Sequence, residues 1–463
     1  MADKPRWYHQ GRASGGWHAP RLVRVWIVAP LAVLGAVGAG YLIYRFVVDP
    51  LVANASDAIK LTLAIVTLIG AVLAGVYAYR KQRIAESDAH RADANQFADR
   101  YTTVAGQLGH DKAAVRLAGV YALARLADDW EEQRQVCIDV LCAYLRMPYQ
   151  PDPDASGYKE GEREVRLTVL GLIRDHLRLP LVHPHSWQGL HFDFSSVTFD
   201  GGDLSGAVFS GGTVDFGRAV FPGGTVSFAG AVFSGGLVSF GRARFSGGTV
   251  DFTRAEFSGG TVSFDSGEFS GGLVSFDSGE FSDGTVTFDS GEFSGGLVIF
   301  DRARFSGGEV IFGRAEFSGG TVSFGFGARF SGSEVIFDSA RFSGGEVIFG
   351  RAEFSGGTVS FGFGARFSSS EVSFGRARFS GGEVSFDSAE FSGGTVSFGR
   401  TVRFGFGAEF SGSTVDFTRA EFSGGTVDLR SVASWAKPPL FHEEVLSAPP
   451  AGLLLPSEPH VRP

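Results

Sequence analysis

Several residue types are scarce in this chain of 463 residues. It has only two cysteines, Cys137 and Cys142, and no lysine between Lys159 and Lys437. Cysteines five positions apart on a predicted helix are poorly placed to form a disulfide, and so few of them suit a reducing compartment. The net charge is −9, and a repeat region without a basic stripe argues against nucleic-acid binding. We therefore expect no disulfide and no direct nucleic-acid partner.

Catalytic motifs are also absent from the sequence. It contains no phosphate-binding loop, no nucleophile next to a base and no isolated pair of carboxylates. The histidine cluster of His183, His185 and His191 has no cysteine nearby and lacks the spacing of a zinc site. We interpret these histidines as polar residues where the chain enters its repeats, and an enzyme built on them is one alternative. The prediction is a non-enzymatic protein with no catalytic, cofactor-binding or metal-binding residues and no cofactor.

A twelve-residue repeat fills residues 194–429. Its phenylalanines are spaced alternately five and seven apart, and a small or branched apolar residue lies two positions before each one. Ala255 precedes Phe257 in this way, and Val262 precedes Phe264. Residues two apart on an extended strand share a face, so both side chains of each pair point inward. A helix would need apolar residues three and four apart, and the pattern therefore predicts short strands.

Such short units predict a β-solenoid over residues 186–430. One unit cannot bury its apolar face alone and must stack on its neighbours. The paired glycines supply corners, because glycine tolerates positive φ. If two units form one turn, about nine or ten turns stack at a spacing of about 4.8 Å, with ladders of phenylalanine inside.

The start of the repeats resembles a known family. The segment "FSSVTFDGGDLSGAVF" places Phe194, Phe199, Leu204 and Phe209 at a strict spacing of five. Within it, "DLSGAVF" resembles the A(D/N)Lxx motif of pentapeptide-repeat proteins. The resemblance implies a right-handed quadrilateral β-helix. The later units carry two extra residues at every second corner, so turns built from four pentapeptides and turns built from two twelve-residue units both remain open.

Three units are longer than the others. "FGFGARF" occurs at Phe324 and at Phe361, and "FGFGAEF" occurs at Phe404. The first two place six residues between successive inward phenylalanines. We interpret the extra residue as a one-residue β-bulge, which arose by drift in a tandem array or, alternatively, serves as a kink or a docking ledge.

Two uncharged runs predict transmembrane helices at residues 25–44 and 61–79, each long enough to cross about 30 Å of hydrocarbon. Residues 1–24 form an N-terminal segment, and residues 45–60 form a short extracytoplasmic loop. The basic residues that flank the two runs are Lys4, Arg6, Arg12, Arg21, Arg24, Arg80, Lys81 and Arg83. By the positive-inside rule, both termini and the repeat domain lie in the cytoplasm.

The sequence predicts a helical linker domain over residues 80–185. Apolar residues at helical spacing place Leu117, Val120, Tyr121 and Ala124 on one face and Val136, Val140, Leu141, Tyr144 and Leu145 on another. "VRLAGVYALARLA" followed by "VLCAYLR" resembles the juxtamembrane segment of actinobacterial pentapeptide-repeat membrane proteins, which implies no catalytic residues. After the repeats, we expect residues 431–463 to form a cap, with Trp435 and Phe441 over the last turn, and a disordered proline-rich tail.

The predicted function is a non-enzymatic scaffold, held in the cell membrane as a multi-pass protein. Its expected partners are the lipid bilayer and unknown proteins on the solenoid surface. The small residues of the first span, Gly35, Ala36, Ala39 and Gly40, are expected to let the two spans of one chain pack closely, with self-association as the alternative. The alternative function is an acidic mimic or protector that binds a nucleic-acid enzyme, with Asp265, Asp277 and Asp289 imitating a row of phosphates. Four arginines interrupt that row: Arg302, Arg314, Arg351 and Arg376.

Overall fold

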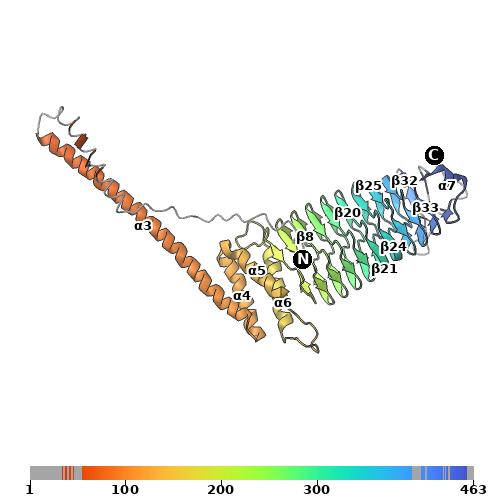
Figure 1. Cartoon of the computed structure of the whole chain (residues 1–463), viewed down its shortest axis with the longest axis horizontal. Helices are drawn as coiled ribbons and strands as arrows, with labels where there is room; N and C mark the ends of the chain where they lie inside the picture. Colours follow the sequence, from red (N-terminus) through yellow and green to blue (C-terminus); the bar gives the residue numbers. More distant parts are fainter. Residues whose placement is uncertain are drawn as a thin grey trace, which may run out of the picture. The chain divides into compact units, whose positions relative to one another are not determined.

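The structure is a computed structural model, and Figure 1 shows the chain. It describes residues 34, 37–38, 41–42, 45, 55–398, 408–411, 414–430, 432, 434–435 and 438–455. The chain divides into two compact units, residues 1–96 and 97–463, and each is described by itself. The predicted N-terminal segment 1–24 and the small residues of the first predicted span lie outside the described residues.

A single long helix dominates the first unit. This helix, α3 (Ala55–Leu108), contains 54 residues and ends in the second unit. Within the described part of the chain, no helix combines the length and the apolar character that crossing a membrane requires, so the two predicted transmembrane helices gain no support. Most of residues 25–44, and some side chains of residues 61–79, lie outside that part. The second predicted span is continuous in α3 with a charged segment that begins at Arg80.

Three helices and a 3₁₀ turn form what we call the helical collar. They are α4 (Ala113–Asp129), η3 (Glu131–Gln133), α5 (Arg134–Arg146) and α6 (Glu162–Leu177). Val120, Leu141 and Val169 are fully buried between them, as the helical spacing predicts. Tyr121 and Val136, also predicted on buried faces, are instead 58% and 42% exposed. The buried stripe of α4 is centred on Val120, Leu123 and Ala127, which turns Tyr121 outward.

The repeats form a β-solenoid of about ten turns, in which every strand pairing is parallel. One sheet contains 19 strands: β1 (Phe192–Asp193), β3 (Val208–Ser210), β4 (Thr213–Asp215), β7 (Val232–Ser234), β8 (Leu237–Ser239), β11 (Glu256–Ser258), β12 (Thr261–Ser263), β15 (Glu280–Ser282), β16 (Thr285–Thr287), β19 (Arg304–Phe305), β20 (Glu309–Ile311), β22 (Arg329–Phe330), β23 (Glu334–Ile336), β25 (Glu353–Ser360), β28 (Arg378–Ser385), β31 (Glu409–Phe410), β32 (Thr414–Phe417), β35 (Ser434–Trp435) and β36 (Leu440–Phe441).

The other sheet contains 18 strands: β2 (Gly202–Asp203), β5 (Val220–Phe221), β6 (Thr225–Ser227), β9 (Arg244–Phe245), β10 (Thr249–Asp251), β13 (Glu268–Phe269), β14 (Leu273–Ser275), β17 (Glu292–Phe293), β18 (Leu297–Ile299), β21 (Glu316–Ser323), β24 (Arg341–Ile348), β26 (Arg366–Phe367), β27 (Glu371–Ser373), β29 (Glu390–Phe391), β30 (Thr395–Ser397), β33 (Glu421–Phe422), β34 (Thr426–Asp428) and β37 (Leu453–Leu454).

The strand register fixes the length of one turn. Phe257 pairs with Phe281, and Val262 pairs with Val286, so each regular turn contains two repeat units rather than four pentapeptides. Each regular turn contributes two strands to each sheet, and in β21, β24, β25 and β28 the two are joined into one strand of eight residues. A glycine corner joins the two strands of one sheet, and a two-residue turn leads to the other sheet. A β-solenoid agrees with the pentapeptide-repeat resemblance, while its quadrilateral cross-section and its right-handedness stay predictions.

Stacked phenylalanines fill the interior, as the sequence predicts. Phe264 stacks on Phe240 and Phe288, with ring centroids 4.7 and 4.8 Å apart and nearly parallel planes. It also meets Phe276 edge to face at 5.6 Å. The inward phenylalanines of the regular turns are at most 3% exposed. Each contributes about 1.5–3 kcal/mol by burial, and each favourable ring pair adds about 0.5–1.5 kcal/mol.

In the regular corners the second glycine lies where successive turns approach closely. Gly272 has φ 70°, and a Cβ there would lie 2.5 Å from the carbonyl oxygen of Gly248 in the preceding turn. No other residue fits that space at that backbone conformation. Ser333 and Ser370 occupy the equivalent position in two other corners and have no positive φ, so glycine is required only where the corner adopts that backbone conformation.

The extra residue of the longer units does not form a bulge within a strand, and that prediction is wrong. Arg304 pairs with Arg329, and Phe305 pairs with Phe330, so the strand register continues across a turn that is one residue longer than the regular ones. The extra residue instead enlarges the turn between the two sheets. There Phe326 adopts a positive φ of 51° and faces solvent. The third long unit, at Phe404, lies mostly outside the described residues.

The C-terminal segment covers the last turn, as predicted. Trp435 pairs with Phe410, and Phe441 stacks on Phe417 with ring centroids 5.1 Å apart. The short helix α7 (Glu443–Ser447) follows. Strand β37 then pairs with β34, although the sequence predicted disorder there. Leu453 and Leu454 of this strand pair in parallel with Val427 and Asp428, and so extend the ladder by one strand.

Candidate interaction surface

The outward side chains of the solenoid form two mixed columns of charge. In each column the residue before a buried phenylalanine pairs with its counterpart one turn away. The first column contains Glu256, Glu280, Arg304, Arg329, Glu353, Arg378 and Glu409. The second contains Arg244, Glu268, Glu292, Glu316, Arg341, Arg366, Glu390 and Glu421. The Arg304–Glu280 and Arg341–Glu316 ion pairs measure 2.7 and 2.6 Å. Such exposed pairs contribute about 0–1 kcal/mol each to stability. An arginine or glutamate of these columns can therefore leave its ion pair for another charged group at little cost in free energy.

The aspartates proposed as phosphate mimics do not form one row. Asp265 and Asp289 lie in turns that lead from the 19-stranded to the 18-stranded sheet, whereas Asp277 lies in a turn on the opposite edge. Arg302 binds Asp277 through two nitrogens, and Arg314 binds Asp289 in the same way. The acidic groups are thus divided between two edges and interspersed with arginine.

Two further aspartates show how neighbours change the pKa of a turn carboxylate. Arg419 donates to both oxygens of Asp387 and lowers its pKa. Burial raises the pKa of Asp301, even though Ser323 donates a hydrogen bond of 2.6 Å to it. The first carboxylate favours its charged form and the second disfavours it.

The helical collar seals the first turn of the solenoid, beside which it lies in Figure 1. Helix α5 contacts β1, and α6 contacts β2. The guanidinium of Arg166 donates to the carbonyl oxygen of Thr198 at 3.1 Å and lies 4.3 Å from the ring of Tyr149. Four more arginines join the collar to this turn: Arg146 to Asp193, Arg163 to Asp200, Arg174 to Asp203 and Arg178 to Ser205. Sequence periodicity did not indicate these contacts, because each is made only once.

A buried ion pair holds the collar together. Arg116 lies 3.0 Å from Glu162, and their side chains are 6% and 13% exposed. Tyr144 donates a hydrogen bond of 3.0 Å to the same carboxylate.

The two cysteines of the collar, Cys137 and Cys142, are buried and unpaired, as predicted, and burial raises the pKa of each to about 12. Thiols of this kind are poor nucleophiles at neutral pH.

Of the three histidines of the sequence cluster, His183 and His185 lie together, with ring centroids 5.4 Å apart, while His191 contacts Thr213 instead. His185 lies 3.7 Å from Asp128, whose carboxylate also contacts His176 at 3.2 Å. His191 is at the entry to the solenoid, where its Nδ1 accepts a hydrogen bond from the backbone of Thr213. No group of three or more His, Cys, Asp or Glu side chains in the described part of the chain could hold a metal ion.

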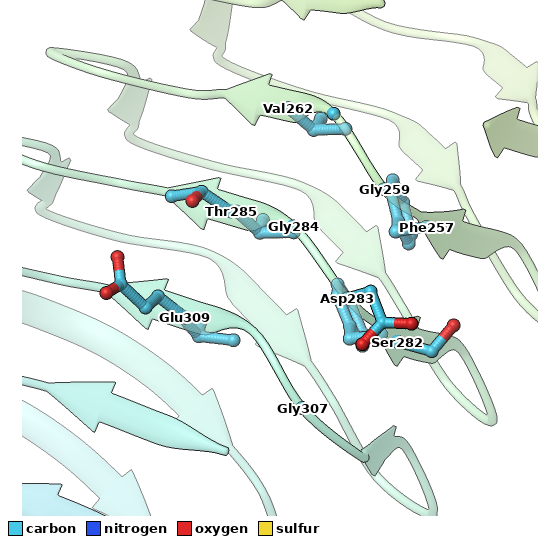
Figure 2. A pocket seen from close by; sticks show the side chains of 13 residues that line it. Phe257, Gly259, Val262, Ser282, Asp283, Gly284, Thr285, Gly307 and Glu309 are labelled. Atoms are coloured by element: carbon cyan, nitrogen blue, oxygen red, sulfur yellow. The ribbon is translucent and has the colours of Figure 1, made fainter. Parts of the chain in front are cut away.

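A small hollow at a glycine corner is shown in Figure 2. Gly259, Asp283 and Gly307 lie one above another there, at equivalent positions of three successive turns. Asp283 takes the place of a glycine and has a positive φ of 54°. The cavity volume is about 10 Å³, which is the space of a single water molecule. This corner can therefore accept a water molecule but not an organic substrate.

A larger groove lies beside the second enlarged turn. It has a volume of about 620 Å³ and is lined by Ser290, Glu292, Arg314, Glu316, Ser339, Arg341, Phe363, Gly364 and Arg366. The ring of Phe363 is 75% exposed. An exposed aromatic ring surrounded by charged side chains is typical of protein interaction sites. The unusual unit length pointed to this place in the sequence, but the exposure of Phe363 could be seen only in the structure.

Comparison with known proteins supports the nature of the repeats. The family model for pentapeptide repeats (nine copies) matches residues 194–244. The match begins where the spacing of five is strict and extends into the first twelve-residue units, so this segment is similar to pentapeptide repeats. Neither the comparison with curated proteins nor the comparison with solved structures found a match.

Proposed function

We propose that the protein is a non-enzymatic scaffold, anchored in a membrane, whose solenoid binds other proteins. The observation that carries this proposal is the solenoid of about ten turns with mixed columns of arginine and glutamate. Repeat proteins of this kind offer extended surfaces for binding. The interspersed arginines do not favour the alternative of an acidic mimic.

The membrane anchor rests on the sequence and on the apolar face of α3. Residues 25–44 and 61–79 carry no charge, and exposed apolar side chains on α3 include Leu68 (66%), Val72 (56%) and Tyr77 (70%). Apolar side chains exposed at this density are expected to be removed from water by another apolar surface, and the hydrocarbon core of a bilayer is such a surface. In this proposal both termini and the solenoid lie in the cytoplasm, following the flanking basic residues.

Alkaline extraction of membranes tests the anchor. The full chain should stay in the carbonate-washed pellet. A variant with Leu34→Arg, Val37→Arg, Leu68→Arg and Val72→Arg should move to the supernatant, because each arginine at the centre of a span costs about 2.5–3.5 kcal/mol. Recovery of the wild-type chain in the supernatant would refute the anchor. Protease protection in inverted vesicles then tests orientation, since cytoplasmic domains are cleaved there.

Affinity capture tests the scaffold. The full chain, solubilised in detergent, should retain specific proteins that a variant with Arg304→Glu, Arg329→Glu and Arg378→Glu releases. A matched control is Arg125→Glu, an exposed arginine of the helical collar, which should leave capture unchanged. Identical proteins in all three samples would argue against binding through the solenoid columns.

A further inference from the structure

Two phenylalanines of the solenoid are exposed at equivalent places in the two enlarged turns. The rings of Phe326 and Phe363 are 57% and 75% exposed, and their φ values are 51° and 47°. A bulky residue with positive φ is strained. The same place in neighbouring turns is occupied by Ser339 and Ser388 beside Phe363, and by Arg302 and Arg351 beside Phe326. Both rings lie within the same local sequence, GFGAR. Burial would stabilise each ring, and the turn itself does not provide that burial.

The two rings lie on different edges of the solenoid. The turn with Phe326 leads from β21 to β22, and thus from the 18-stranded to the 19-stranded sheet. The turn with Phe363 leads from β25 to β26, in the opposite direction. We call these the Phe326 edge and the Phe363 edge. Each molecule therefore presents both at once.

The two edges carry charge surpluses of opposite sign. Within one turn of the exposed ring, the Phe326 edge has four arginines and two acidic residues: Arg302, Arg304, Arg329, Arg351, Asp301 and Glu353. The Phe363 edge has two arginines and three acidic residues: Arg341, Arg366, Asp338, Asp387 and Glu390. Opposite charges of this kind favour contact of one edge with the other and disfavour contact of like edges.

The shapes of the two edges also differ. The Phe363 edge contains the groove of about 620 Å³, whose charged lining residues are Glu292, Glu316, Arg314, Arg341 and Arg366. On the Phe326 edge, the guanidinium of Arg351 lies 5.7 Å from the ring centroid of Phe326. The ring of Phe326 can pack on the exposed ring in that groove, and both surfaces carry arginines together with carboxylates that can pair across the contact.

We propose that the Phe326 edge of one molecule docks in the Phe363 groove of a second copy of this chain, so that solenoids associate side by side. The contact joins two different surfaces, so a docked pair still offers one free Phe363 edge on the first molecule and one free Phe326 edge on the second. Such heterologous contacts extend into open rows unless the rotation between copies closes a ring. The proposal does not depend on the membrane anchor.

Sedimentation velocity of the purified full chain in detergent tests this pairing. Wild-type protein should form dimers and larger species as its concentration rises. Phe326→Ser and Phe363→Ser should each weaken association at least about 30-fold, the loss typical of an interface hot spot. Mixed in equal amounts, the two variants should form a dimer and nothing larger, because one intact edge remains on each. Raising the salt concentration should weaken wild-type association.

A matched control replaces an exposed apolar residue away from both edges. Leu237 on β8 is 45% exposed, and the equivalent positions in adjacent turns are threonines. Leu237→Ser should leave association unchanged. Thermal melting of every variant should match the wild type, since neither exposed ring belongs to the core. A monomeric wild type, association that survives both phenylalanine substitutions, or a mixture that stays monomeric would overturn the proposal.

Discussion

The solenoid and the helical collar are stabilised in different ways. In the solenoid each contact recurs in every turn, so that Phe264 has near-identical stacking partners on both sides. In the collar each contact occurs once, and the Arg116–Glu162 pair has no second copy. Repetition spreads stability over many equivalent contacts, whereas the collar depends on a few specific ones. Single substitutions should therefore differ in effect between the two regions.

The largest effect is expected for Arg116→Ala in the collar. Removal of Arg116 leaves Glu162 buried without its countercharge, which costs about 3–5 kcal/mol. Urea unfolding of the full chain, followed by fluorescence of the buried Trp187, measures the change. Arg125→Ala is the control, since the pair of Arg125 with Asp129 is exposed and should contribute at most about 0.5 kcal/mol. Equal shifts for both variants would contradict the comparison.

A smaller effect is expected from the glycine corners of the solenoid. A Cβ at Gly271 would lie 2.6 Å from the carbonyl oxygen of Ser246, whereas one at Gly259 would meet no atom within 4 Å. Gly271→Ala should cost about 1–3 kcal/mol through overpacking. Gly259→Ala should cost about 1 kcal/mol, because its φ of 72° strains alanine.

Hydrogen exchange of the amides in the adjacent turns measures both glycine variants. The larger opening should be confined to the turns next to residue 271. If Gly259→Ala proved the more damaging of the two, backbone strain would outweigh the approach of neighbouring turns at these corners.

A still smaller effect is expected for Phe276→Leu in a phenylalanine column. Leu204 and Leu429 already occupy the ends of this column, so the backbone accepts leucine there. Loss of the ring contacts should cost about 1 kcal/mol, spread over neighbouring turns. The same exchange measurement applies, with protection lost near residues 252 and 300 only. Unfolding of the whole solenoid would show that repetition does not buffer single changes.

The smallest effect concerns pH. Arg419 holds the pKa of Asp387 below 3.8, so this pair stabilises the fold above that pH and the gain disappears as the pH falls through the lowered pKa. Burial raises the pKa of Asp301 above 3.8, and its ionisation therefore destabilises the fold as the pH rises through the raised pKa. Asp387→Asn should lower stability at neutral pH by at most about 1 kcal/mol, since Arg419 is exposed, and Asp301→Asn should raise it slightly. Urea midpoints between pH 3 and 7 measure both, and shifts of the same sign would contradict this assignment.

Periodic features of the molecule could be predicted from the sequence, and single features could not. The spacing of Phe257 and Phe264 was sufficient to predict short strands and an apolar interior. The end of the repeats was sufficient to predict a cap. Whether Asp265 and Asp277 share an edge depends on the length of a turn, because positions one repeat unit apart fall on opposite edges when a turn contains two units. The sequence also could not show whether the extra residue near Phe326 entered a strand or a turn. The arginines that join the collar to the solenoid leave no pattern at all, because they bind backbone carbonyls or lone carboxylates.

The two-unit turn constrains how this gene can grow or shrink. Loss of two adjacent units shortens the rod by one layer and leaves every later strand in its own sheet. Loss of one unit would transfer all later strands to the other sheet, and it would move each exposed phenylalanine beyond the deletion to the opposite side of the rod. The C-terminal cap would then meet the wrong ladder. Viable length variants should therefore differ by even numbers of units.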